Sequence, residues 1–485
     1  MSINRSILTG AIWVVAARWG IRGIGLISTL ILVRLLTPAD FGVVAMAMIV
    51  VGMVEVFGET GLVLYVIRHP DPKDDHFNTV WTLRLIVGLV LAAVLFLGAE
   101  QGAIFFNEPA IEPAIQLLAL RPLMLGLENP GILWFRKNME FNRDFEFLVL
   151  NKIVAFVVTI ALAYWLRNYW ALVFGILTGG LAALLQSYRM HPYRPWFCLK
   201  YTRDAWGFSF WILVQNLFVY FEHRLDELII GRLKSTESLG FYAVASDVAA
   251  SPVREIVVPA SRAMFPGFAK LAGDPEALAN SFARIQAAIA IIAFSVSTGI
   301  ALVAYDLTYF LLGEKWLEIV PLLQILTLSA GVFSISQPMF TLMSSLGRVR
   351  LSACLTMMRI ALLAAIIVPI AMDGDLADIA FGRLIATIIA TFLSFAVFIA
   401  IDPKLLWATI IALLRPAIAT LGMVACVLLL QEQLADMQLL RFIASIGVGA
   451  LSFAIGLLLI WLICGRPNTI EADVLHYVKG RFGLR

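Results

Sequence analysis

Two pairs of charged residues stand inside long apolar stretches, where charges are costly. Arg18 and Arg22 are four residues apart, and Glu55 and Glu59 repeat this spacing in the next apolar stretch. Residues at this spacing share one face of a helix. A charge at the centre of a membrane-spanning helix costs about 2.5–3.5 kcal/mol on insertion scales, so such residues face a protein interior or a wet cavity. The two arginines could therefore bind an anion, with the carboxylates as their partners in its absence.

The same spacing also fits a purely structural role. Counting inward at about 1.5 Å per residue, Arg18 lies about 22 Å and Glu55 about 21 Å from the shared end of two predicted helices. An antiparallel pair of helices would bring them together as a buried ion pair that only holds the helices in register. Both interpretations, a cavity wall and a structural clamp, stay open at this point.

A second cluster of ionisable residues occupies a later apolar stretch. Its members are Glu222, His223, Arg224, Asp226 and Glu227. Glu222 shares a helix face with Asp226, and His223 shares one with Glu227. Asp247 in the following stretch could approach them. Carboxylates beside a histidine can titrate in a useful pH range, so a proton- or Na⁺-linked site is one interpretation and a structural salt-bridge network is the other.

Further cations stand within predicted spans. The additional candidates for the anion-binding cavity are Arg121, Arg224 and Arg383. Three other cations stand about two turns from a span end, namely Arg84, Lys152 and Arg359. We interpret these three as interfacial, because a long side chain can carry its charge to the membrane surface. The four cysteines show no paired spacing and no Walker-type loop is present, so we expect no disulfide, metal, cofactor or nucleotide site on this chain.

The composition fixes the elements that must position these charges. Of the 485 residues, 61% are hydrophobic and 14% are charged, and the mean hydropathy is +0.90. Apolar stretches of about 20 residues recur throughout, enough for a helix to cross a hydrocarbon core of about 30 Å. We therefore predict an all-α polytopic membrane protein with about fourteen transmembrane helices. The predicted spans are 9–33, 41–65, 79–99, 112–131, 147–166, 170–188, 208–230, 239–261, 284–305, 320–345, 351–372, 376–400, 405–430 and 442–464.

An internal repeat divides the chain. RLLTPADFGVVAMA begins at Arg34, where the first span gives way to the second, and RLKSTESLGFYAVA begins at Arg232, at the equivalent place six spans later. The alignment matches Thr37 with Ser235 and Gly42 with Gly240. It predicts two pseudo-symmetric six-helix bundles around a central cavity. The predicted parts are a half-bundle at 1–190, a cytoplasmic interfacial linker at 191–207, a half-bundle at 208–401, two further spans at 402–464 and a basic cytoplasmic tail at 465–485.

Three segments carry a resemblance to a known family. LVRLLTPADFGVVAMAMIVVGMVEVFGETGL, LDELIIGRLKSTESLGFYAVA and ENPGILWFRKNMEF resemble polysaccharide exporters of the Wzx type, within the multidrug, oligosaccharidyl-lipid and polysaccharide exporter superfamily. The resemblance is greatest to the branch that includes colanic acid exporters. It implies a flippase that moves an undecaprenyl-diphosphate-linked oligosaccharide across the bacterial inner membrane by alternating access, for surface polysaccharide synthesis.

Other functions fit the sequence less well. A multidrug or cation exporter of the same superfamily would favour aromatic and acidic cavity walls over this many arginines. A membrane glycosyltransferase or ligase would present a large outer loop with catalytic side chains, and the predicted outer connections are short, so we expect no enzyme. The expected partners are the lipid-linked oligosaccharide and membrane lipids, with a polysaccharide polymerase and glycosyltransferases as candidates, and no nucleic acid.

The distribution of cations gives a testable topology. With the N-terminus inside, the cytoplasmic segments hold about 21 Lys and Arg residues and the outer segments about 6. With an even number of spans, both termini lie in the cytoplasm. Reporters fused to either terminus should show cytoplasmic activity only, and periplasmic activity from a C-terminal fusion would contradict the span count.

Overall fold

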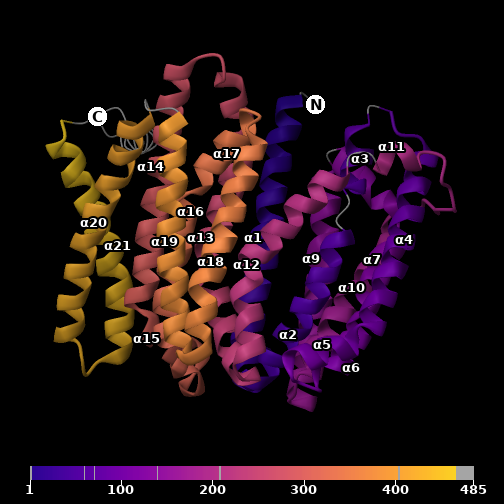
Figure 1. Cartoon of the computed structure of the whole chain (residues 1–485), viewed down its shortest axis with the longest axis horizontal. Coiled ribbons are helices and arrows are strands. Elements are labelled where there is room, and N and C mark those ends of the chain that lie inside the picture. Colours follow the sequence, from indigo (N-terminus) through magenta and orange to yellow (C-terminus); the bar gives the residue numbers. More distant parts are fainter. Residues whose placement is uncertain are drawn as a thin grey trace. The chain divides into compact units, whose positions relative to one another are not determined.

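The computed structural model describes residues 3–58, 61–69, 71–138, 140–206, 209–401 and 405–465. These residues form a succession of helices, α1 to α21, joined mostly by short turns, with a longer extended segment between α10 and α11 (Figure 1). They group into two compact units, Met1–Gly240 and Phe241–Arg485, each described by itself below. The all-helical fold predicted from composition is confirmed. Its physical reason is that a helix bonds all its central backbone groups within its own segment, as hydrocarbon requires.

Unit 1 combines long and short helices. The long ones are α1 (Ile3–Leu35), α2 (Pro38–Glu55), α4 (Asp74–Leu97), α9 (Phe141–Leu166), α10 (Trp170–Met190) and α12 (Ser209–Leu233). The short ones are α3 (Leu62–Arg68), α5 (Ala99–Phe106), α6 (Ile111–Leu118), α7 (Leu120–Leu127), α8 (Leu133–Lys137) and α11 (Thr202–Trp206). Helix α9 packs against both α1 and α10, α4 packs along α7, and α2 packs against α6 and α12. We call the end of this unit where α2 begins the Pro38 end, and the end where α4 begins the Asp74 end.

Unit 2 contains the remaining helices. They are α14 (Pro275–Leu302), α15 (Ala304–Leu307), α16 (Val320–Ile335), α17 (Gln337–Ser345), α18 (Val349–Asp373), α19 (Leu376–Ile401), α20 (Leu405–Gln433) and α21 (Gln438–Ile463). Helix α13 (Thr236–Leu271) begins in unit 1 and continues into unit 2. Within unit 2, α14 packs against α16 and α20, and α19 packs against α16 and α18.

The predicted spans fall mainly on helices in the part of the chain that the structure describes. Among the described residues, eleven helices are long and apolar enough to cross a membrane. The three other predicted spans, 112–131, 208–230 and 239–261, correspond to the pair α6 and α7, to α12 and to α13. The helices α6 and α7 are too short, and α12 and α13 are not among the eleven. The total of fourteen therefore stays a prediction.

The structure corrects the predicted course of the second span. Hydropathy predicts one span over 41–65, but α2 ends at Glu55, a 3₁₀ turn follows at Val56–Gly58, and α3 begins only at Leu62. Gly61 has φ of +69°, a left-handed conformation that glycine adopts without steric cost. Hydropathy averages over a window and does not register such a break.

Equivalent caps start α2 and α13. The Thr37 hydroxyl accepts a hydrogen bond from the amide of Asp40 at 3.3 Å, and the Asp40 carboxylate bonds back to the Thr37 amide at 2.9 Å. The Ser235 hydroxyl accepts from the amide of Ser238 at 3.1 Å. The repeat match of Thr37 with Ser235 is thus a match of helix N-caps, since both hydroxyls bond the amide three residues further on.

The repeated glycines lie at a crossing of these two helix starts. A Cβ added to Gly42 would collide with the carbonyl of Thr236, and a Cβ added to Gly240 would collide with the carbonyl of Pro38. All four residues belong to unit 1. Because Pro38 and Thr236 are themselves equivalent in the repeat, the contact is reciprocal. Only glycine allows two backbones to approach this closely.

The segment 191–201 binds along α4 at the Asp74 end. The Asn78 side chain accepts hydrogen bonds from the Tyr193 hydroxyl at 2.7 Å and from the Trp196 amide at 3.1 Å, and the Thr82 hydroxyl accepts from the Cys198 amide at 3.0 Å. The Trp196 side chain is exposed. Burial raises the pKa of the Tyr193 phenol, which stays protonated and able to donate. Part of the predicted interfacial linker is therefore held on α4 by buried polar side chains.

The glycine crossing gives a stability prediction. The Gly42→Ala variant should be less stable by about 1–3 kcal/mol, because its methyl group must displace the Thr236 backbone. The matched control is Gly23→Ala in α1, where a Cβ meets nothing within 4 Å and helix propensity favours alanine by about 0.8–1 kcal/mol. Thermal unfolding of the purified proteins measures both, and an unchanged midpoint for Gly42→Ala would show that the crossing is loose.

Candidate functional site

A charged cavity of about 530 Å³ lies within unit 1. Its walls come from the end of α2, the start of α3, the middle of α4, α7 and one residue of α12. Its polar lining residues are Glu55, Arg84, Arg121 and Asn216. The remaining lining is apolar or glycine, so the charged groups stand in a poorly hydrated setting in which electrostatic interactions are strong.

Glu55 and Arg121 form an ion pair across the cavity. The Arg121 guanidinium donates to the Glu55 carboxylate at 2.6 Å, with 17% of the Glu55 side chain and 32% of the Arg121 side chain exposed. The pair joins the last residue of α2 to the second residue of α7. A carboxylate placed here keeps the arginine compensated, while the exposed part of the guanidinium stays accessible from the cavity.

Arg84 supplies a second guanidinium from α4. Its terminal nitrogen donates to the carbonyl of Leu125 at 2.7 Å and to the Glu128 carboxylate at 3.3 Å. The interfacial interpretation of Arg84 is wrong, because this side chain is bonded to α7 and lines the cavity. A depth comparison would have found the pair, since Arg84 and Glu128 stand close to the same end of their two predicted spans.

Glycines bring the backbones of α4 and α7 together behind these side chains. A Cβ at Gly88 would lie 2.5 Å from the carbonyl oxygen of Pro122, and one at Gly126 would lie 2.7 Å from that of Arg84. The two helices are therefore in direct backbone contact along the cavity wall. Their closeness fixes the height of Arg84 relative to Arg121 and closes the wall between them.

The guanidinium groups of the cavity are paired with carboxylates. Arg121 is bonded to Glu55 within the lining, and Arg84 is bonded to Glu128, which lies outside the lining. Guanidinium groups bind carboxylate and phosphate oxygens with two parallel hydrogen bonds. The cavity is thus suited to an anionic group, and Glu55 can hold Arg121 when no anion is present.

The structure places the other predicted cavity residues in unit 1 as follows. Arg18 and Arg22 are half-buried on α1, which packs against α9, and neither lines the charged cavity. Glu59 lies outside the described residues. Arg224 is exposed on α12 and forms an ion pair with the buried Glu227 one turn away. Two members of the predicted set, Glu55 and Arg121, lie together in the charged cavity.

The predicted ion-coupling residues divide between the two units. On α12 in unit 1, Asp226 is buried and Glu222 and His223 are half-buried. Asp247 is exposed on the part of α13 that belongs to unit 2. Helix α12 is attached to α2 by the Tyr220 hydroxyl, which donates to the carbonyl of Ile49 at 2.6 Å. A coupling role for this cluster stays a prediction.

Unit 2 holds two cations that sequence analysis singled out. Arg383 is half-buried on α19. Arg359 is buried on α18, 4.5 Å from the ring centroid of Phe333 and 5.2 Å from that of Phe340, and it donates to the Ser336 hydroxyl at 3.1 Å. The interfacial interpretation of Arg359 is therefore wrong, because this cation is held between aromatic faces inside unit 2.

Solved structures share this fold. The lipid II flippase MurJ in an inward closed conformation matches 95% of this chain and 100% of its own, with a TM-score of 0.71 and 12% identity. An inward-facing multidrug resistance MATE family transporter of the MOP superfamily matches 79% of this chain and 94% of its own, with a TM-score of 0.62 and 14% identity. The protein is thus of the multi-pass membrane class whose fold occurs in lipid flippases and multidrug transporters.

The family follows from the sequence match. The family described as polysaccharide biosynthesis protein matches residues 31–321, and the chain belongs to this family. Its relatives include the lipopolysaccharide biosynthesis protein WzxC of Escherichia coli strain K12, 25% identical over 84% of this chain and 83% of that protein. Another is the succinoglycan biosynthesis transport protein ExoT of Rhizobium meliloti strain 1021, 23% identical over 92% of each chain. The predicted resemblance to polysaccharide exporters is confirmed.

The ion pair in the cavity gives a second stability prediction. Glu55→Gln and Arg121→Gln should each lower stability by about 1–3 kcal/mol, because each leaves a charge without its partner in an apolar wall. The double variant should be more stable than the sum of the two single effects implies. The exposed pair Arg143 and Glu140 is the matched control, with side chains 53% and 42% exposed, and its loss should change stability by under about 1 kcal/mol. Additive effects of the Glu55 and Arg121 substitutions would exclude an energetic coupling.

Proposed function

We propose that this protein is a flippase that moves an undecaprenyl-diphosphate-linked oligosaccharide across the bacterial inner membrane by alternating access. The observation that carries the proposal is the cavity in unit 1, which presents the guanidinium groups of Arg84 and Arg121 in an otherwise largely apolar lining. Membership of the polysaccharide biosynthesis protein family supports it. The relative ExoT is named as a transport protein, and the structurally similar MurJ is named as a lipid II flippase. Both names also support the proposal.

The chemistry of the cargo fits the cavity. A diphosphate carries about two negative charges, which matches two guanidinium groups better than a single ammonium. Its arrival would replace Glu55 as the partner of Arg121, so the pair opens only when a competing anion is present. The volume of about 530 Å³ falls within the range of about 300–1,000 Å³ typical of ligand sites. It accommodates the diphosphate and the adjoining sugar, and the rest of the oligosaccharide extends beyond this cavity.

The orientation follows from the distribution of cations. We place the Asp74 end of unit 1 in the cytoplasm and the Pro38 end at the outer face, with both termini cytoplasmic. The segments at the Asp74 end include Lys73, Arg136, Lys137 and Lys200, which supports the assignment. Arg18, Arg22, Glu59, Arg224 and Arg383 stay proposed as further cargo-binding residues.

Export of cationic drugs is the second candidate, favoured by the fold shared with the MATE transporter. A cavity for a cation needs a surplus of carboxylate or of aromatic faces. The carboxylates at the cavity in unit 1 are already bonded to arginines, Glu55 to Arg121 and Glu128 to Arg84. We therefore place this function, and any membrane-bound glycosyl transfer, behind the flippase.

The test is translocation by the purified protein in liposomes. The cargo is undecaprenyl-diphosphate-linked disaccharide with a fluorescent label, and a membrane-impermeant reagent that modifies the sugar reports its arrival at the far leaflet. Arg84→Gln and Arg121→Gln should each slow translocation by about tenfold or more, since a hydrogen bond to a charged group contributes about 1.5–3 kcal/mol. The Lys variants should be intermediate, because lysine keeps the charge but not the planar fork.

The control is Arg441→Gln, which removes an ion pair with Asp306 in unit 2 outside this cavity. Its translocation rate, divided by the amount of folded protein reconstituted, should match that of the wild type. Equal rates for the cavity variants and this control would contradict an anion site at Arg84 and Arg121. Transport of a cationic dye in preference to the labelled lipid would favour the second candidate.

A further inference from the structure

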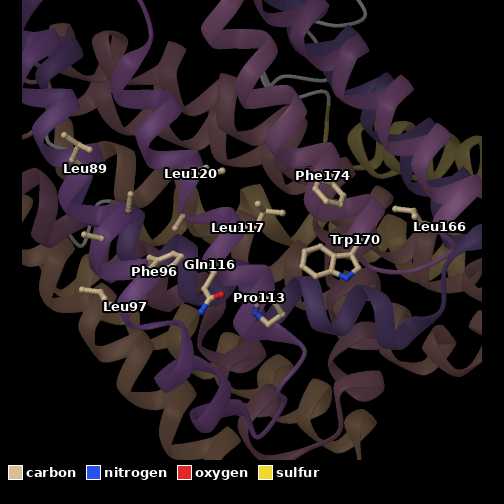
Figure 2. A pocket seen from close by; sticks show the side chains of 13 residues that line it. Leu89, Phe96, Leu97, Pro113, Gln116, Leu117, Leu120, Leu166, Trp170 and Phe174 are labelled. Atoms are coloured by element: carbon tan, nitrogen blue, oxygen red, sulfur yellow. The ribbon is translucent and has the colours of Figure 1, made fainter.

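A large apolar groove opens on unit 1, on the opposite side of α4 and α7 from the charged cavity. It encloses about 1050 Å³ and is lined by thirteen residues, of which only Gln116 is an uncharged polar residue and none is charged. Figure 2 shows Leu89, Phe96 and Leu97 of α4 on one side, Trp170 and Phe174 of α10 on the other, and side chains of α6 and α7 between them. Because the predicted spans place this surface at membrane depth, a hydrocarbon chain suits its apolar lining.

The groove has the length of one leaflet. Its α4 lining runs from Leu89 to Leu97, the last residue of that helix, which spans about 12 Å at 1.5 Å per residue. Its α10 lining begins at Trp170, the first residue of that helix. One leaflet contributes about half of a hydrocarbon core of about 30 Å. The groove therefore extends from the Pro38 end inward by about the depth of one acyl chain.

The charged cavity and the groove are separate spaces. Gly88 of α4 contacts the Pro122 backbone, and Gly126 of α7 contacts the Arg84 backbone. These contacts leave no opening between the two helices where they cross. A lipid whose diphosphate lies in the cavity cannot pass its tail directly between α4 and α7 into the groove. The groove is therefore not reached from the cavity by this route.

A cation marks the Pro38 end of the groove. Arg167 is exposed at the end of α9, between the lining residues Leu166 and Trp170. Its guanidinium lies 6.0 Å from the ring of the exposed Tyr164, in the kind of aromatic belt that sits at the headgroup level. Two carboxylates at this end of the unit, those of Asp40 and Glu108, already accept hydrogen bonds from other groups of the protein. Asp40 accepts the Tyr169 amide at 2.8 Å, and Glu108 accepts the Thr236 hydroxyl at 2.5 Å.

We propose that this groove is a binding site for an anionic phospholipid of the outer leaflet, with one acyl chain between α4 and α10 and the phosphate at Arg167. The apolar lining, the one-leaflet length and the cation at its end together fit this ligand. A zwitterionic lipid would supply the chain but would gain less from the arginine. The site is independent of transport, so it stands or falls separately from the proposed cargo.

The experiment uses the full chain in nanodiscs with a trace of phosphatidylglycerol that carries a photoactivatable diazirine at the end of one acyl chain. Crosslinked peptides should come from α4, α6 and α10. Unlabelled phosphatidylglycerol should compete about fivefold better than phosphatidylethanolamine, the factor that one interfacial arginine contributes toward an anionic headgroup. Arg167→Gln should remove this preference, and Lys234→Gln, a cation at the same end outside the groove, should keep it.

A second experiment fills the groove with a bulky side chain. Ala93→Trp should abolish labelling of the α10 peptide, whereas Ala161→Trp, on an exposed face of α9 outside the groove, should leave it unchanged. The competition measured on the wild-type chain decides the question even if Ala93→Trp does not fold. Equal competition by both phospholipids would reduce the groove to ordinary bilayer contact and overturn the proposal. Displacement of the probe by undecaprenyl phosphate in preference to phosphatidylglycerol would also overturn it, because the groove would then hold a polyprenyl tail.

Discussion

The structure of this protein depends on one constraint, that a charge at membrane depth must find its partner within the chain. Hydrocarbon offers no water to solvate an isolated guanidinium or carboxylate. Arg121 is therefore bonded to Glu55 and Arg84 to Glu128, and in unit 2 Arg441 is bonded to Asp306. Each ion pair joins two different helices, so the requirement for compensation also fixes which helices lie together. The charged cavity exists because two such pairs converge on α7.

The constraint explains why the fold could be predicted from sequence and where the prediction failed. Apolar length alone placed the predicted spans mainly on helices, since a spanning segment has few alternatives. The interruptions were missed, because they depend on single residues. Helix α2 ends at Glu55 and the chain turns at Gly61 in a left-handed conformation, although the average hydropathy there stays high. A window of twenty residues cannot resolve a turn made by one glycine.

The sequence identified several residues of the candidate site but not the contacts between them. Depth counting identified Glu55 as a buried charge and proposed Arg18 and Arg22 as partners, and it did not foresee the ion pair of Glu55 with Arg121. Counting along a helix gives the height of a residue in the membrane but not the neighbour that it faces. Arg84 was assigned to the interface for the same reason. The direction of a side chain around the helix axis is set by tertiary packing, here by the close glycine contacts of α4 with α7.

The crossing of Gly42 and Gly240 has the form of an isologous contact, in which a surface meets a copy of itself. In a symmetric dimer of half-length chains, one altered codon at such a glycine would appear on both sides of the interface at once. In a single chain the two sides are encoded separately and have already diverged, since Thr236 is bonded to Glu108, whereas proline occupies the equivalent position 38. Duplication within one gene thus lets each side of an inherited symmetry vary alone, which suits a protein whose two membrane faces meet different solutions.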